Sequence, residues 1–178
     1  MRGYADGVFE SDDRPPLRMR VVPELRYLGS FLFDLKQVAR VERHVFVETE
    51  NALVRRMLVL QFEGFLPNVD EMYRYALTDP RELGGATYGR RTGELSVSQE
   101  RAESPDGEMT HTVIFLESQG LVLPDHQAVA RFARILGQDR RRELLIFYHE
   151  CDGAVDGILG RAEQAFTLSL VAGPPSRR

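Results

Sequence analysis

Four neighbouring side chains, His149-Glu150-Cys151-Asp152, are of the types that bind metals or transfer protons. On an α-helix, successive side chains point in directions about 100° apart, so these four could not converge on one ion. On a β-strand, only His149 with Cys151, or Glu150 with Asp152, would share a face. We therefore expect neither a metal site nor a cofactor here, and retain only His149 as a weak candidate for a catalytic residue.

Cys151, the only cysteine, fits a buried position better than a reactive one. It falls at helical spacing on an apolar stripe with Leu144, Phe147 and Tyr148, where a thiol behaves as a small core residue. Its two acidic neighbours disfavour the thiolate that a nucleophile requires. Asp152 is expected to cap a following helix.

The segment LQFEGFLPNVDEMYRY, residues 60–75, carries a second group of candidates. Gln61 and Glu63 fall on one face of an expected strand, close to its end. A charge among apolar neighbours needs a compensating contact, so Glu63 is a weak candidate for a general base. Tyr73 and Tyr75 follow. We expect these four residues to bind a ligand, and the alternative is a solvated strand end with a tight turn.

The composition is that of an ordinary globular chain. Of 178 residues, 43% are hydrophobic and 28% are charged, and the net charge is −4. That charge does not favour attraction to nucleic acid or to anionic membranes. No apolar run reaches the ~18–20 residues of a membrane span, and the N-terminus does not have the pattern of a signal peptide. Because one cysteine cannot form an internal disulfide, we expect a cytoplasmic protein.

The common catalytic and nucleotide-binding motifs are absent from the sequence. It contains no G-x-G-x-x-G, no P-loop, no H-E-x-x-H and no G-x-S-x-G. Arginines occur in runs at 55–56, 90–91 and 140–142, but acidic residues flank each run. We expect these arginines to form ion pairs on solvated faces, which makes nucleic-acid binding unlikely.

The hydrophobic pattern changes along the chain from strand-like to helix-like. Alternating and continuous apolar runs predict hairpins around residues 41–62 and 86–99. Stripes at helical spacing predict four helices. For the first of them, and for residues 140–150, a strand is the alternative. The four ranges are about 112–119, 125–136, 140–151 and 155–170. The prediction is an α+β fold, with an antiparallel sheet from the N-terminal half packed against helices from the C-terminal half.

The expected organisation is one domain over residues 17–172, between a flexible leader at 1–16 and a flexible tail at 173–178. The absence of a catalytic constellation and the aromatic-rich β half favour a non-catalytic domain. It would bind a protein partner, a second copy of itself or an apolar small ligand, and would not bind a membrane. The alternative is an enzyme of unknown class that uses Glu63 or His149 for proton transfer. Nucleic-acid binding through arginines comes third.

Overall fold

The fold is built mainly from β-strands. The computed structural model describes residues 2–13, 15–151 and 153–170. Strands account for 54% of the described residues and helices for 16%, so the expected α+β fold with a helical C-terminal half is wrong. One sheet has four strands: β1 (Arg2–Ala5), β2 (Val8–Ser11), β3 (Leu17–Val21) and β11 (Phe166–Leu170). The other has seven: β4 (Arg26–Leu35), β5 (Ala39–Glu50), β6 (Leu53–Phe65), β7 (Pro80–Leu83), β8 (Ala86–Ser96), β9 (His126–Leu136) and β10 (Arg142–Cys151).

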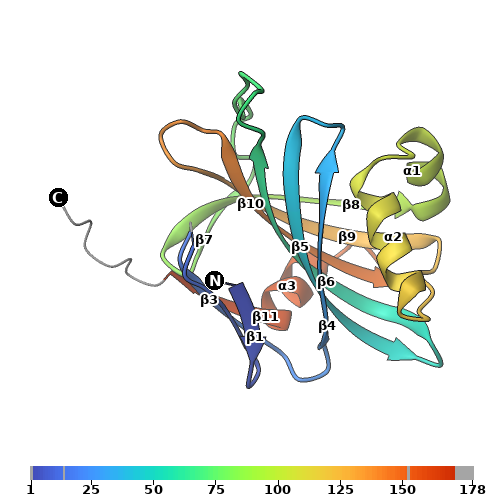
Figure 1. Cartoon of the computed structure of the whole chain (residues 1–178). Coiled ribbons are helices and arrows are strands. Elements are labelled where there is room, and N and C mark those ends of the chain that lie inside the picture. The colour runs from blue at the N-terminus through green and yellow to red at the C-terminus, as the bar shows by residue number, and fades with distance from the viewer. Residues whose placement is uncertain (1, 14, 152, 171–178) are drawn as a thin grey trace.

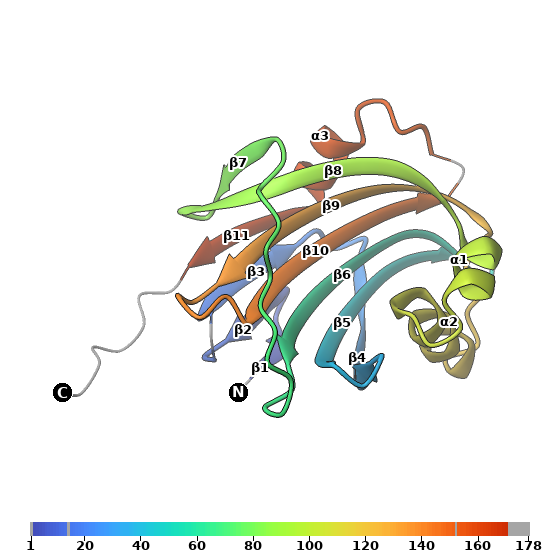
Figure 2. The same ribbon diagram turned by 90° about the horizontal axis from the view of Figure 1, so that it is seen from above.

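The large sheet is the middle layer of the molecule. Its strand order is β4-β5-β6-β10-β9-β8-β7, and that of the small sheet is β1-β2-β3-β11. All neighbouring strands in both sheets are antiparallel. The small sheet lies on one side of the curved large sheet, and helices α1 (Val97–Glu103) and α2 (Glu108–Ser118) lie at one end of the other side (Figures 1 and 2). Helix α3 (Ile158–Ala165) leads into β11.

Two hydrophobic cores hold these layers together. The first lies between the sheets and includes Phe9 and Met19 from the small sheet and Phe46 and Tyr148 from the large one. The second lies between the large sheet and helices α1 and α2, where side chains such as Met57 pack against the helices. Because side chains alternate along a strand, each central strand contributes to both cores.

The helices expected at 125–136 and 140–151 are strands β9 and β10. Both lie in the interior of the large sheet, and apolar side chains occupy both of their faces. A strand buried on both sides has no polar face, so its apolar residues also satisfy helical spacing without forming a helix. The prediction failed because periodicity cannot distinguish the two in such a segment.

The other segments agree with expectation in part. The hairpin expected over 41–62 is present as β5 and β6. Residues 86–99 do not form a hairpin, because Thr92 and Gly93 continue the pairing of β8 with β9. Helix α2 overlaps the helix expected at 112–119. Only residues 158–165 of the helix expected at 155–170 are helical, and 166–170 form β11.

The N-terminal residues take part in the fold. Residues 2–11, expected within a leader over 1–16, form β1 and β2, and Phe9 is fully buried. The tail expected at 173–178 and the helix cap expected at Asp152 lie outside the described residues. In the part of the chain that the structure describes, no helix has the length and apolar character needed to cross a membrane.

Gly84 and Gly85 form the turn between β7 and β8 and provide a matched test of how the sheets meet. Both have positive φ, +59° and +83°, so alanine is strained at either position. A Cβ on Gly84 would lie 2.5 Å from the carbonyl oxygen of Leu168 in β11, whereas a Cβ on Gly85 would meet nothing within 4 Å. We expect Gly84→Ala to lower the free energy of unfolding by about 1 kcal/mol more than Gly85→Ala, as measured by urea denaturation. Equal effects would show that this turn does not pack on β11.

Candidate functional site

The register of the large sheet gathers polar side chains on the face where α1 and α2 pack. Glu63 of β6 lies directly opposite Glu143 of β10, and Arg43 of β5 lies opposite Gln61 of β6. His149 projects from the same face, three alternations further along β10 than Glu143. Arg43, Gln61, Glu143 and His149 are all buried. Buried polar groups require hydrogen-bond partners, so their contacts determine what this face can do.

Arg43 connects the sheet to helix α2. Its Nε donates to Oε1 of Gln61 at 2.6 Å, and its Nη1 donates to the carbonyl oxygen of Glu108 at 3.0 Å and to the hydroxyl of Thr112. Its Nη2 forms an ion pair with Oε1 of Glu108 at 3.1 Å. Burial lowers the pKa of Arg43, but an arginine remains charged at neutral pH. The guanidinium is therefore a buried cation whose partners are mostly supplied by the start of α2.

The opposed carboxylates of Glu63 and Glu143 each accept a hydrogen bond from a tyrosine. Tyr73 donates to Oε1 of Glu63 at 2.7 Å, and Tyr75 donates to Oε2 of Glu143. Gln61 Nε2 donates to Oε2 of Glu63 at 2.7 Å. The structure thus brings Gln61, Glu63, Tyr73 and Tyr75 into one cluster and adds Glu143 to it.

The surroundings of these carboxylates favour their protonated forms. Burial raises the pKa of Glu63, and the nearby carboxylate of Glu108 raises it further. Burial raises the pKa of Glu143 to about 7; the hydrogen bond from Tyr75 opposes that rise, and the charge of Glu63 adds to it. An acid with a pKa near neutrality can both donate and accept a proton. The pair therefore has the protonation chemistry of a general acid–base group.

A long irregular segment, residues 66–79, crosses the strands of the large sheet (Figure 2) and contains both tyrosines. Arg141 donates to the carbonyl oxygens of Leu66, Val69 and Glu71 at 3.0, 2.6 and 3.1 Å. The backbone N–H of Tyr73 donates to the carbonyl of Arg140 at 2.8 Å. The 66–79 segment is thus fastened to the β9–β10 turn across the strands, and arginines expected on a solvated face instead bind backbone.

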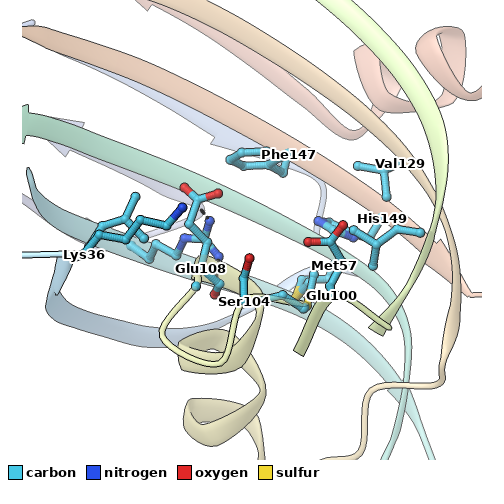
Figure 3. Close-up of a pocket in the computed structure, with 13 residues that line it drawn as sticks. Lys36, Met57, Glu100, Ser104, Glu108, Val129, Phe147 and His149 are labelled. Carbon is cyan, nitrogen blue, oxygen red and sulfur yellow. Dashed lines mark hydrogen bonds and ion pairs between the residues drawn. The ribbon is translucent and has the colours of Figure 1, made fainter. Parts of the chain in front are cut away.

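His149 is buried at the wall of a pocket of about 240 Å³ between the large sheet and the α1–α2 segment. Burial lowers the pKa of His149 to about 3, and the positive charge of Arg43 acts in the same direction, so the imidazole is neutral at pH 7. Its Nδ1 has no hydrogen-bond partner among the described residues. Figure 3 shows Phe147, Val129 and His149 on the sheet side of the pocket and Ser104 on the α1–α2 side. Apolar side chains lie beside His149 in the pocket, and the charged side chains of Lys36, Arg43, Glu100 and Glu108 complete its lining.

The segment around His149 is a strand, so its neighbours separate onto two faces. Cys151 shares the face of His149, and its thiol donates to the carbonyl of Val54 at 2.8 Å. Glu150 points to the other face, where it forms an ion pair with Arg161 at 2.8 Å. His149 and Glu150 therefore do not converge, as the strand alternative had indicated. Within the described residues, no group of three or more His, Cys, Asp or Glu side chains could hold a metal ion.

The sequence analysis missed Arg43, Glu108 and Glu143. A signal for Arg43 exists, because it stands between Val41 and Val45 on an otherwise apolar strand face. Glu108 and Glu143 carry no comparable signal, since their partners are distant in sequence. Comparisons of the chain with protein-family models, with curated proteins and with solved structures gave no match.

Proposed function

We propose that this protein binds a small, largely apolar molecule in the pocket between the large sheet and α1–α2, through a hydrogen bond to His149. The observation that carries the proposal is the unpartnered Nδ1 of His149. Leaving such a buried atom unpaired costs about 1–3 kcal/mol, which a ligand can recover. Met57, Val129 and Phe147 supply an apolar surface beside it.

The pocket suits a small molecule. Its volume, about 240 Å³, is several times the ~30 Å³ share of one water molecule and slightly below the usual range of drug-sized sites. A neutral imidazole has one nitrogen that accepts and one that donates, so either a hydroxyl or an amine could pair with it. The occupant we favour is a bicyclic aromatic or branched aliphatic compound with one polar group.

The ligand is favoured over a protein partner or self-association, because the pocket beside His149 provides a concave and partly apolar surface. Nucleic-acid binding has less support, since many arginines are committed to carboxylates. Arg56 pairs with Glu48, and Arg90 pairs with Asp79 and Glu163.

A second candidate function is proton transfer at Glu63 and Glu143. It is favoured by the direct opposition of the two carboxylates and by the pKa of about 7 for Glu143. Both carboxylates are, however, hydrogen-bonded to tyrosines of the same chain. A reaction at this pair would have a bell-shaped pH profile and would be lost in both Glu63→Gln and Glu143→Gln.

The proposal is tested with N-phenyl-naphthylamine, an uncharged aromatic amine whose fluorescence increases in apolar sites. We expect one molecule to bind per chain. Val129→Phe should weaken binding at least about tenfold, because the larger ring fills the pocket. His149→Leu should weaken it by about tenfold, because the amine N–H loses its acceptor.

The matched control is Val122→Phe, the same exchange at a valine that is 53% exposed and does not line the pocket. The Val122→Phe variant should bind N-phenyl-naphthylamine with the affinity of the wild-type protein. The proposal is contradicted if the amine does not bind, or if Val129→Phe binds it as tightly as Val122→Phe does. Urea denaturation of each variant establishes that it is folded.

A further inference from the structure

Two arginines face one another beside the pocket that His149 lines. Arg91 of β8 and Arg131 of β9 are directly opposite in register, so their side chains leave the sheet on the same face. Like charges in this position repel, and the pairing needs an explanation. The next position along that face is occupied by Gly89 and Ala133, which are also opposite one another. A Cβ on Gly89 would lie 3.0 Å from the Cα of Leu77, so the 66–79 segment packs directly on the sheet there.

A second pocket, of about 200 Å³, lies beside this contact, between the sheet and the 66–79 segment. Its lining contains three arginines and no carboxylate: Tyr75, Ala76, Leu77, Thr78, Gly89, Arg90, Arg91, Arg131 and Ala133. The charge of Arg90 is matched by Asp79 and Glu163, outside the lining. The excess positive charge of the pocket therefore comes from Arg91 and Arg131.

Among the described residues, neither of these two arginines forms an ion pair with a carboxylate, although the charge of Arg131 acts on Glu143 and lowers its pKa. Arg91 Nη2 donates to the neutral hydroxyl of Thr78 at 3.3 Å. Arg131 has a buried Nε with no hydrogen-bond partner among the described residues, and its guanidinium lies 6.0 Å from the ring centroids of Tyr75 and Phe147. The nearby carboxylate of Glu143 accepts its hydrogen bond from Tyr75 instead. A guanidinium that forms no ion pair, has an unpartnered buried N–H and lies near two aromatic rings is suited to an anion.

The two pockets occupy adjoining parts of one sheet face. Val129 and Phe147 line the first, and Arg131, two residues after Val129 and directly opposite Phe147, lines the second. His149 is opposite Val129, so Arg131 is its diagonal neighbour, with a Cα separation of about 7–8 Å. The two pockets share no lining residue, so a small molecule that reaches both has to lie across the Phe147 ring.

We propose that the ligand is a small organic acid, whose apolar body lies on Val129 and Phe147 and whose anionic group binds between Arg91 and Arg131. This inference rests on the proposed function and names the chemical class of its ligand. Guanidinium groups bind carboxylates through two parallel hydrogen bonds, and such charge-assisted bonds are stronger than neutral ones. An anion here also relieves the repulsion between the two arginines.

The test compares two probes with nearly the same aromatic skeleton. Anilinonaphthalene sulfonate differs from N-phenyl-naphthylamine by its sulfonate, which stands in for the carboxylate. We expect the wild-type protein to bind the sulfonate at least about tenfold more tightly than the amine. That preference should decrease as salt is added, because the anionic contact is partly exposed.

The preference is expressed as the dissociation constant of the amine divided by that of the sulfonate. Arg131→Met and Arg91→Met should each reduce this ratio, and Arg131→Met should bring it close to one. Arg18→Met is the control, because Arg18 is a surface arginine of the small sheet with a 61% exposed side chain. It should keep the wild-type ratio. Because Arg91 is exposed, Arg91→Met provides a second test should Arg131→Met fail to fold.

The outcomes separate the two proposals. If the wild-type protein binds neither probe, the proposed function fails and this inference fails with it. If both probes bind with equal affinity, or if the arginine variants keep the wild-type ratio, only the anionic class of ligand is overturned. If Arg18→Met lowers the ratio as much as the pocket variants do, the preference for the sulfonate comes from overall charge. That result would also overturn the anionic class of ligand.

Discussion

Replacing Arg43 by alanine is expected to lower the free energy of unfolding by about 3–5 kcal/mol, the usual cost of breaking a buried ion pair from one side. The variant would leave Glu108 without its cation and Gln61 and Thr112 without their donor. It would also remove the main polar link between the sheet and α2. Urea denaturation followed by circular dichroism measures the change.

Arg40→Ala is the matched control, because Arg40 lies on the same strand and forms an exposed ion pair with Asp34 at 2.7 Å. Exposed pairs of this kind contribute at most about 1 kcal/mol. If Arg43→Ala costs no more than Arg40→Ala, the buried network does not hold α2 to the sheet.

Replacing Glu143 by glutamine is expected to stabilise the protein above pH 7 by about 3 kcal/mol at most. Burial raises the pKa of Glu143 from 4.5 to about 7 in the folded state, so folding favours the protonated acid. The stability associated with that proton is fully present below pH 4.5 and is lost as the pH rises through 7. A difference of 2.5 pH units at 1.36 kcal/mol per unit gives the estimate of about 3 kcal/mol. Glutamine remains neutral and keeps an acceptor for Tyr75.

The measurement is the difference in unfolding free energy between variant and wild type, from pH 4 to pH 8. It should be small at pH 4 and should increase towards pH 8. Glu24→Gln, at an exposed position, should show no such trend. A difference that is constant across this range would mean that Glu143 ionises as readily in the folded protein as in the unfolded chain.

Local sequence patterns predicted several parts of the site. The alternation of side chains along β6 correctly put Gln61 and Glu63 on one face, and Tyr73 does contact Glu63. The hairpin of β5 and β6 followed from an apolar run interrupted by a turn. These features depend on residues close in sequence, where backbone geometry relates side chains directly.

The same reasoning failed for β9 and β10, and with them for most of the site. Both strands are buried between two layers and carry apolar side chains on both faces, so a strand period could not be recognised in their composition. Because both segments were predicted to be helices, the strand register could not be predicted. That register places Glu63 opposite Glu143 and Arg91 opposite Arg131. Those pairings join residues that are 80 and 40 positions apart.

The sequence by itself determined that His149-Glu150-Cys151-Asp152 could not be a four-ligand site, because neither helix nor strand geometry lets consecutive side chains converge. Only the tertiary structure decided that His149 lines a pocket with its Nδ1 unpaired, and that Arg131 lies diagonal to it. The reason is physical: the direction of a side chain follows from its own backbone, whereas its partners depend on which strands are neighbours and in which register they pair.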